Sequence, residues 1–340
     1  MARRLAAALV TSLAAGASGC AAAHPSTTTT ATTSATSTAA ATAPAAAAGR
    51  VLDGEHRGPA GARRYELYVP STGAAGGRPL VVMLHGCTQT AADFARGTRM
   101  NALAETAGAL VLYPEQPATA NPQRCWNWYD PAHQGRDAGE PAILAAMTRE
   151  VAAAHGADPR RIYVAGVSAG GAMALALAAN FPTLYAAAGV HSAVPYAAAR
   201  DVGGAVAAMR AGGAGDPAAV TRAMGAARRT VPLVVFHGTA DAVVSPANGR
   251  AIATQWSGAA GLAPLAEEAP FSSRAESARD YSVLHYGEGR PAPVQLWLIE
   301  GLGHAWSGGS PDGTYTDPRG PDASRELLDF LLAHRLPEAR

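Results

Sequence analysis

The sequence predicts an α/β domain: a mostly parallel sheet flanked by helices. From about residue 50 onward, short β-branched or aromatic runs alternate with alanine-rich helical stretches, which is the pattern of repeated strand–helix units. The strand-like runs are continuously apolar, as buried parallel strands are. A chain of 340 residues can form such a sheet as one large unit, so we expect a single domain over residues 50–340.

The expected elements follow the chain in order. Strands are predicted at residues 64–69, 79–84, 109–113, 161–165, 186–190, 232–236 and 294–299, and helices at 91–107, 141–155, 169–180 and 323–334. Segment 196–230 is rich in Ala, Gly and Arg without a clear strand. We expect it to form a helical insertion or cap over the carboxyl edge of the sheet.

The first twenty residues have the features of a signal peptide. Arg3 and Arg4 form a positive n-region, residues 5–15 form an apolar stretch too short to span a bilayer, and small residues precede Cys20. A cysteine at this place is also the lipidated residue of bacterial lipoprotein signals, although Ala17 stands where leucine is usual. We expect an exported protein, extracellular, periplasmic or at the cell surface, either freely secreted or lipid-anchored through Cys20.

Composition predicts a linker after the signal and argues against highly charged partners. Residues 21–49 are almost entirely Ala, Thr, Ser and Pro, a composition that buries too little apolar surface to offset the entropy of ordering, so a disordered linker is predicted. The whole chain carries 27 basic and 26 acidic residues, a formal net charge of +1. This balance argues against nucleic acid or an anionic membrane surface as a partner.

The residues Gly166-Val167-Ser168-Ala169-Gly170 lie between a predicted strand and a predicted helix. Strand, G-x-S-x-G and helix in this order are typical of a nucleophile elbow, a sharp turn that exposes a serine hydroxyl above a sheet. The helix N-terminus presents free N–H groups beside that hydroxyl. We predict that Ser168 is a nucleophile and that the Ala169 N–H stabilises an oxyanion. A glycine-rich turn with an idle serine is the alternative.

A nucleophilic serine needs a base and a carboxylate that orients the base, and each has one preferred candidate. Asp241 follows the predicted strand 232–236 through a short turn, and His304 follows the predicted strand 294–299 through a glycine-containing loop. Both should lie at the carboxyl edge of the sheet, where sites form in open α/β sheets. The alternatives are that Asp241 only stabilises a turn and that His304 is structural.

The predicted strand 79–84 ends in His85-Gly86-Cys87. A second oxyanion amide usually lies at this place, and we assign it to the Cys87 N–H. We expect His85 to orient the loop by a hydrogen bond rather than to act in catalysis. Without Cys20, the remaining Cys87 and Cys125 form an even pair in an oxidising compartment, which predicts a disulfide. Two separate buried thiols are the alternative.

Aromatic residues gather at positions 126–129, W-N-W-Y, and Trp306 follows His304 by two residues. The polar residues and proline beside the first group favour a loop over a buried strand. We therefore expect Trp126 and Trp306 to line a substrate cleft. Packing in the core is the alternative for both.

Together, several segments resemble the polyhydroxybutyrate depolymerase and feruloyl esterase group of α/β-hydrolases. The matching segments are H-G-C-T-Q at 85–89, C-W-N-W-Y at 125–129, G-V-S-A-G-G at 166–171, H-G-T-A-D at 237–241, G-H-A-W-S-G-G at 303–309 and G-P-D-A-S-R-E at 320–326. The resemblance covers about residues 60–335. It implies an α/β-hydrolase fold, and it implies the following site residues: the triad Ser168, Asp241 and His304, the oxyanion donors Cys87 and Ala169, and the cleft residues Trp126 and Trp306.

These features predict a serine ester hydrolase that works by two-step acyl transfer, with His304 as base and Asp241 as its orienting acid. This mechanism needs no metal or organic cofactor, and no Cys/His cluster has zinc spacing. Members of the group that attack solid polyester usually carry a linker and a polymer-binding domain after the catalytic domain. Neither is recognised here, so the expected substrates are soluble polyhydroxybutyrate-type oligomers or other hydroxyacid esters. The alternatives are a feruloyl or acetyl-xylan ester and, in another functional class, a non-catalytic surface-binding lipoprotein.

Overall fold

The computed structural model describes residues 49–73, 77–263 and 278–338. These residues belong to the unit Ala46–Arg340. The predicted signal peptide, the Cys20 lipidation site and all of the predicted linker except Gly49 lie outside the described residues. Within the described ranges, no helix combines the length and the apolar character needed to cross a membrane.

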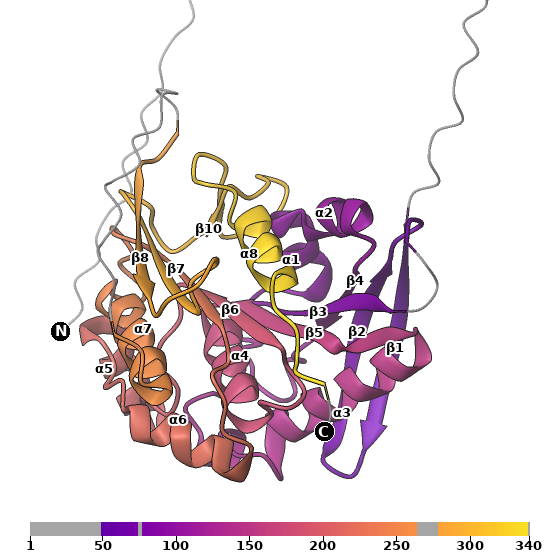
Figure 1. Cartoon of the computed structure of the whole chain (residues 1–340), viewed down its shortest axis with the longest axis horizontal. Helices are drawn as coiled ribbons and strands as arrows, with labels where there is room; N and C mark the ends of the chain where they lie inside the picture. Colours follow the sequence, from indigo (N-terminus) through magenta and orange to yellow (C-terminus); the bar gives the residue numbers. More distant parts are fainter. Residues whose placement is uncertain (1–48, 74–76, 264–277, 339–340) are drawn as a thin grey trace, which may run out of the picture. The chain divides into compact units, whose positions relative to one another are not determined.

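A nine-stranded sheet in the order β1-β2-β4-β3-β5-β6-β7-β9-β8 forms the centre of the domain (Figure 1). Its strands are β1 (Arg50–Gly58), β2 (Gly61–Val69), β3 (Arg78–Leu84), β4 (Leu110–Pro114), β5 (Ala157–Val167), β6 (Ala187–His191), β7 (Leu233–Gly238), β8 (Tyr281–Tyr286) and β9 (Val294–Ile299). From β4 across to β9 all pairs are parallel, whereas β1–β2, β2–β4 and β8–β9 are antiparallel. The predicted, mostly parallel sheet is confirmed, with antiparallel strands at both edges.

The seven predicted strands are all present, and two edge strands are additional. β1 has the polar sequence RVLDGEHRG, which lacks the continuous apolar run of a buried strand. It forms through pairing with β2 over its whole length, from Arg50 opposite Val69 to Gly58 opposite Gly61. β8 is a half-buried edge strand, which pairs with β9 alone. Pairing with a neighbour, rather than apolar sequence, therefore defines β1.

Helices cover both faces of the sheet (Figure 1). One face carries α3 (Gly139–Ala154), α4 (Ala169–Asn180) and α7 (Ala247–Ala260), with α6 (Pro217–Met224) packed against α4 and α7. The other face carries α1 (Ala91–Thr98), α2 (Met100–Ala107) and α8 (Ala323–Leu332). Segment 196–230 is helical, as predicted, with α5 (Val202–Ala211), α6 and the 3-10 turn η2 (Gly225–Ala227).

The helix predicted at 91–107 is two helices, because Arg99 interrupts it. Arg99 has a left-handed backbone with φ 54°, and its N–H donates to the carbonyls of Ala95 and Arg96 at the end of α1. α2 then begins at Met100. A left-handed residue other than glycine is uncommon, so the sequence held no ordinary stop signal at this position.

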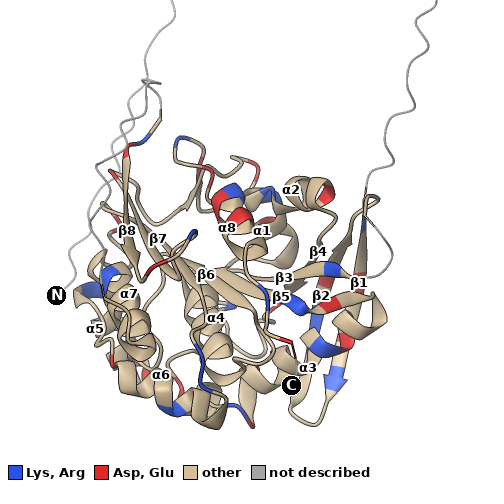
Figure 2. Ribbon diagram, in the orientation of Figure 1, with Lys and Arg blue, Asp and Glu red and all other residues tan. Residues whose placement is uncertain are grey.

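Charged residues of both signs lie side by side on the outer elements. Figure 2 shows this for β1, β2 and α8. On β2, for example, Arg63 and Arg64 are followed by Glu66. The view in Figure 2 therefore shows mixed charge on these elements, in line with the balanced composition of the chain.

The carboxyl ends of four parallel strands place the predicted site residues at one edge of the sheet. The loop with Cys87 follows β3, Ser168 follows β5, Asp241 follows β7 and His304 follows β9. Because parallel strands end at the same edge, segments more than a hundred residues apart in sequence converge there.

Candidate active site

Ser168 occupies a sharp turn between β5 and α4. β5 ends at Val167, α4 begins at Ala169, and Ser168 has φ 54° and ψ −121°. This backbone conformation is sparsely populated for residues other than glycine and is found where surrounding contacts enforce it. One such contact is the hydrogen bond of 2.9 Å that the Ser168 N–H donates to the carbonyl of His191. Backbone and flanking elements thus have the form of a nucleophile elbow.

The glycines on either side of the serine are required by close backbone packing. A Cβ on Gly170 would lie 2.2 Å from the carbonyl oxygen of Leu84 and 2.4 Å from that of His85. A Cβ on Gly166 would lie 2.5 Å from the carbonyl group of Gly170. The neighbouring atoms are backbone and cannot rotate away, so the turn forms only with glycine at both positions.

Asp241 and His304 form a hydrogen-bonded pair. The Nδ1 atom of His304 lies 2.8 Å from Oδ2 of Asp241. The other carboxylate oxygen accepts the N–H groups of Val243 at 3.0 Å and Val244 at 2.8 Å. Burial opposes ionisation of Asp241, but the hydrogen bond and charge of His304 outweigh it and lower the pKa of the carboxyl group. An ionised carboxylate holds a proton on Nδ1, so the neutral ring offers its lone pair at Nε2.

Two further histidines, His191 and His237, are buried near this pair. Nε2 of His237 lies 2.9 Å from the carbonyl oxygen of Val244 and 3.6 Å from Oδ2 of Asp241. Nε2 of His191 accepts the N–H of Ser307 at 3.2 Å. Burial lowers the pKa of both rings, that of His191 to about 3 with help from the nearby histidines. Both rings are therefore neutral at ordinary pH and act as fixed hydrogen-bonding groups.

The loop after β3 brings Cys87 to the amino end of α4. Nδ1 of His85 lies 2.7 Å from the carbonyl oxygen of Gly86, and Nε2 accepts the N–H of Gln116 at 3.1 Å. His85 thus makes the kind of loop hydrogen bond that was expected of it. Within the described part of the chain, the N–H groups of Cys87 and Ala169 have no hydrogen-bond acceptor. Both amides remain available to a ligand.

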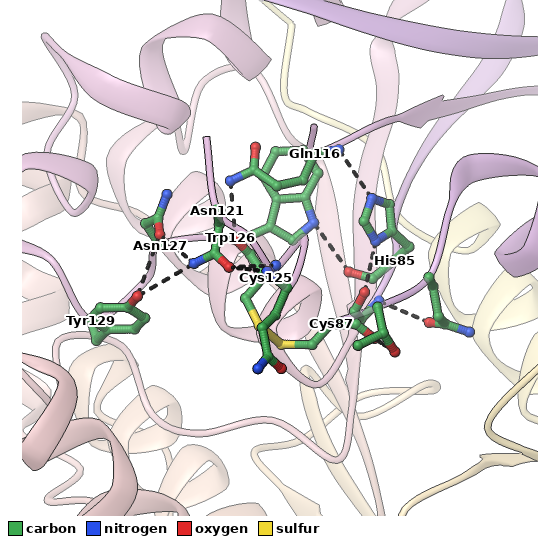
Figure 3. Close-up of a disulfide and its surroundings, with 12 residues drawn as sticks. His85, Cys87, Gln116, Asn121, Cys125, Trp126, Asn127 and Tyr129 are labelled. Carbon is green, nitrogen blue, oxygen red and sulfur yellow. Dashed lines mark hydrogen bonds between the residues drawn. A yellow bond between two sulfur atoms is a disulfide. The ribbon is translucent and has the colours of Figure 1, made fainter. Parts of the chain in front are cut away.

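A disulfide joins Cys87 to Cys125, with Cα atoms 4.2 Å apart (Figure 3). The bond links the loop after β3 to the segment that precedes Trp126. A backbone hydrogen bond joins the same two loops: the N–H of Thr88 donates to the carbonyl of Gln123 at 2.7 Å. Two loops that are 38 residues apart in sequence are therefore held together beside Ser168.

A cavity of about 330 Å³ contains the serine and the histidine. It is lined by Gly86, Cys87, Gln89, Gln123, Cys125, Val167, Ser168, Met209, Val243, His304 and Tyr315. The lining is mostly apolar, and the volume is near the lower end of the range for small-molecule sites. Four of the predicted site residues thus line one cavity: Cys87, Cys125, Ser168 and His304.

The structure places neither predicted tryptophan at this cavity, which corrects the prediction for both. Trp126 is completely buried, and its indole N–H donates to the carbonyl of His85 at 3.1 Å. Trp306 is buried as well; its N–H donates to Ser324 Oγ at 3.0 Å, and its ring stacks on His191. Both indoles therefore pack in the core with their N–H groups satisfied.

Three of the residues that line the cavity were not expected there from the sequence. Met209 comes from α5, Val243 from the turn after Asp241, and Tyr315 from the loop between β10 (Trp306–Ser307) and β11 (Thr316–Asp317). Tyr315 has φ 52°, is half exposed, and forms a hydrogen bond of 3.1 Å with Thr88 Oγ1. Only the unusual backbone of Tyr315 would signal a functional position, and it is visible in the structure alone.

Among the described residues, no three His, Cys, Asp or Glu side chains group in a way that could hold a metal ion. The cavity instead combines a serine on an elbow, a histidine paired with a carboxylate, and two free amides. These groups can together perform nucleophilic acyl transfer.

Comparison with known proteins identifies the family. A model of the family described as "Esterase PHB depolymerase" matches residues 63–279. The chain belongs to this esterase family. It is 33% identical to poly(3-hydroxyalkanoate) depolymerase C of Paucimonas lemoignei over 256 residues, which cover 74% of the chain and 58% of that protein. It is 36% identical to feruloyl esterase B of Neurospora crassa over 141 residues, covering 41% of the chain and 46% of that protein.

Solved structures show the same fold. The acetyl xylan esterase from Aspergillus awamori superposes with a TM-score of 0.67 at 24% identity, covering 83% of the chain and all of that structure. With the sheet and helices described above, this likeness shows an α/β-hydrolase fold. The chain spans about half the length of the first curated relatives that it matches.

Proposed function

We propose that the protein is a serine ester hydrolase whose triad is Ser168, His304 and Asp241. The observation that carries the proposal is the 2.8 Å contact between His304 and Asp241 beside the same cavity that Ser168 lines on its elbow. Membership of a family of esterases supports it. A fold without turnover would have no need of a strained serine that lines the same cavity as a histidine paired with a buried carboxylate.

The proposed reaction proceeds through an acyl-enzyme. Ser168 Oγ attacks the ester carbonyl while His304 Nε2 takes its proton, and the oxyanion that forms is stabilised by the N–H groups of Cys87 and Ala169. The protonated imidazole, oriented by Asp241, then gives its proton to the leaving alcohol. Water repeats the sequence with the acyl group, which releases the acid and restores Ser168.

The proposed substrates are oligomers of polyhydroxybutyrate type or other short hydroxyacid esters. A mostly apolar cavity of about 330 Å³ suits a short acyl unit. The relative named poly(3-hydroxyalkanoate) depolymerase C supports this choice. A feruloyl ester is the second candidate, because one relative is named feruloyl esterase B and the half-exposed ring of Tyr315 at the cavity could stack on an aryl group.

A turnover panel of hydroxybutyrate trimer, methyl ferulate and a short nitrophenyl ester tests the proposal. We expect hydrolysis of the trimer with the highest kcat/KM, and loss of all three activities in Ser168→Ala. Ser257→Ala is the matched control, because that buried serine lies on α7 and donates only to the carbonyl of Thr254. Equal activity of Ser168→Ala and wild type would contradict the mechanism; a preference for methyl ferulate would select the second candidate.

We also propose that the protein is exported by the signal within residues 1–20. Intact mass of the mature chain tests this location: a mass starting at or after Cys20 supports export, and a diacylglycerol adduct on Cys20 supports the lipid anchor. Retention of the complete N-terminus in the cytoplasmic fraction would contradict it.

A further inference from the structure

The peptide bond between Gly86 and Cys87 carries two groups that matter to the site. Its carbonyl oxygen lies 2.7 Å from His85 Nδ1, and its N–H belongs to the proposed oxyanion donor Cys87. A peptide unit is planar, so its C=O and N–H point in fixed, opposite directions. A hydrogen bond that fixes the carbonyl therefore also fixes the direction of the Cys87 N–H.

His85 can hold that carbonyl only when Nδ1 carries a proton. The N–H of Gln116 points at His85 Nε2 from 3.1 Å, so Nε2 must be the acceptor and the neutral ring must carry its proton on Nδ1. Burial lowers the pKa of His85, which keeps the ring neutral. The backbone N–H of Gln116 thus determines which ring nitrogen of His85 carries the proton. Figure 3 shows the hydrogen bond between the two residues.

The side chain of Gln116 is anchored on all sides. It is completely buried; its Nε2 donates to the carbonyl of Cys125 at 3.0 Å and to Glu140 Oε1 at 2.5 Å, and its Oε1 accepts from Arg63 Nε at 3.0 Å. Gln116 lies two residues after β4, in an irregular segment that precedes the 3-10 turn η1 (Pro131–His133). These side-chain bonds are what hold its backbone N–H in front of His85.

Glu140 ends the chain of hydrogen bonds as a fully buried carboxylate. Besides Gln116, it accepts the backbone N–H of Asn127 at 2.8 Å and the Asn127 side-chain amide at 2.8 Å, and Arg63 lies 3.6 Å away. A carboxylate at this depth carries a desolvation cost that apolar packing would avoid. A role in orienting the donors around it explains why a carboxylate stands at this buried position in the first turn of α3.

We infer that Gln116 and Glu140 are positioning residues that aim the oxyanion-hole amide of Cys87, acting through His85. The inference rests on the proposed function and deepens it. Neither residue touches the cavity, and neither is expected to contact substrate. The disulfide ties the same loop through the Cys87 side chain, whereas the His85 hydrogen bond acts on the Gly86–Cys87 peptide group itself.

The test compares Glu140→Gln and Gln116→Met with wild type. Each variant keeps the size of the side chain and removes acceptors or donors of the network. Loss of an oxyanion donor lowers kcat by roughly 10²- to 10³-fold, so partial misalignment is expected to lower kcat/KM by roughly 10- to 100-fold. A trifluoromethyl ketone that adds to Ser168 places an oxyanion in the same site, and its inhibition constant should weaken by the same factor. A methyl ketone of the same shape, which binds without forming the adduct, should keep its dissociation constant.

Three further variants separate positioning from loss of folding. Thr148 lies on the same helix α3 as Glu140, and Thr148→Val removes its buried hydrogen bonds with the Leu144 carbonyl and the Tyr185 hydroxyl. This variant should leave kcat/KM unchanged. His85→Asn retains a donor for the Gly86 carbonyl and should keep more activity than His85→Leu, which does not.

The outcomes distinguish the inference from the function on which it rests. Wild-type ketone affinity and kcat/KM in Glu140→Gln and Gln116→Met would overturn the inference alone, as would a fall in kcat/KM with unchanged trifluoromethyl ketone affinity. Unfolding of both variants together with equal activity of His85→Asn and His85→Leu would overturn it too. A wild-type chain without esterase activity would overturn the proposed function and the inference with it.

Discussion

Replacement of Asp241 by asparagine should separate the role of the carboxylate from its packing. Oδ1 of Asp241 accepts two backbone N–H groups, from Val243 and Val244. An asparagine must keep its oxygen at that position, so its NH₂ group takes the place of Oδ2, 2.8 Å from His304 Nδ1. Because an NH₂ group only donates, Nδ1 must become an acceptor and the ring proton moves to Nε2.

The imidazole of this variant can no longer take the proton of Ser168. In serine hydrolases the corresponding change lowers kcat by about 10⁴-fold, which is about 5.5 kcal/mol of lost transition-state stabilisation. We expect this loss for Asp241→Asn in nitrophenyl ester hydrolysis, with an unfolding midpoint close to wild type. The amide fills the same volume and keeps both backbone hydrogen bonds.

Asp201→Asn is the matched control, because Asp201 also accepts a backbone N–H, from Gly204, but caps α5 and does not contact His304. It should keep wild-type kcat. A kcat for folded Asp241→Asn within tenfold of wild type would refute the assignment of Asp241 as the orienting acid.

Three other predictions follow from the packing around the site. Cys87→Ser together with Cys125→Ser opens a loop of 38 residues, which should lower the free energy of unfolding by about 4 kcal/mol by the loop-entropy relation, measured in urea; an unchanged midpoint would argue against it. Burial lowers the pKa of His191 from 6.5 to about 3, so between these pH values the ring is neutral in the folded protein but protonated in the unfolded chain. Stability should therefore be complete above pH 6.5 and fall as pH drops toward 3, less steeply in His191→Asn; identical slopes in urea titrations would contradict this. Gly170→Ala places a Cβ 2.2 Å from a backbone carbonyl and should abolish activity, whereas Gly135→Ala meets nothing within 4 Å and should be neutral by turnover and melting temperature. An active Gly170→Ala would show that the turn can relax.

The central part of the site could be predicted because its signals are local. The strand, elbow and helix around Ser168 are contiguous in sequence, so one pattern specified all three. Asp241 and His304 each follow a buried strand directly, and parallel strands deliver such residues to one edge whatever the path of the connections. The disulfide could be predicted from the number of cysteines and from the expected oxidising compartment.

Features that depend on long connections could not be predicted. The side from which a loop tryptophan packs is not encoded in periodicity, and Trp126 and Trp306 both turned to the core, where His85 and Ser324 satisfy their N–H groups. Tyr315 reached the cavity through a loop without a periodic pattern. The strand β1 formed on its neighbour rather than on its own apolar sequence.

The buried network of Gln116 and Glu140 was also beyond the sequence. Glutamine and glutamate are mostly exposed in proteins, so a glutamine after a strand and a glutamate at the start of a helix are expected at the surface. Only the structure shows both completely buried and joined to each other.

The most direct test of the central claim is covalent labelling of Ser168 with a fluorophosphonate probe, located by peptide mass spectrometry. The folded protein should carry one phosphonyl group, on Ser168, formed at a rate that falls sharply in His304→Ala and disappears in Ser168→Ala. Absence of an adduct on Ser168 in the folded protein, or equal labelling after heat denaturation, would contradict an activated serine at this site.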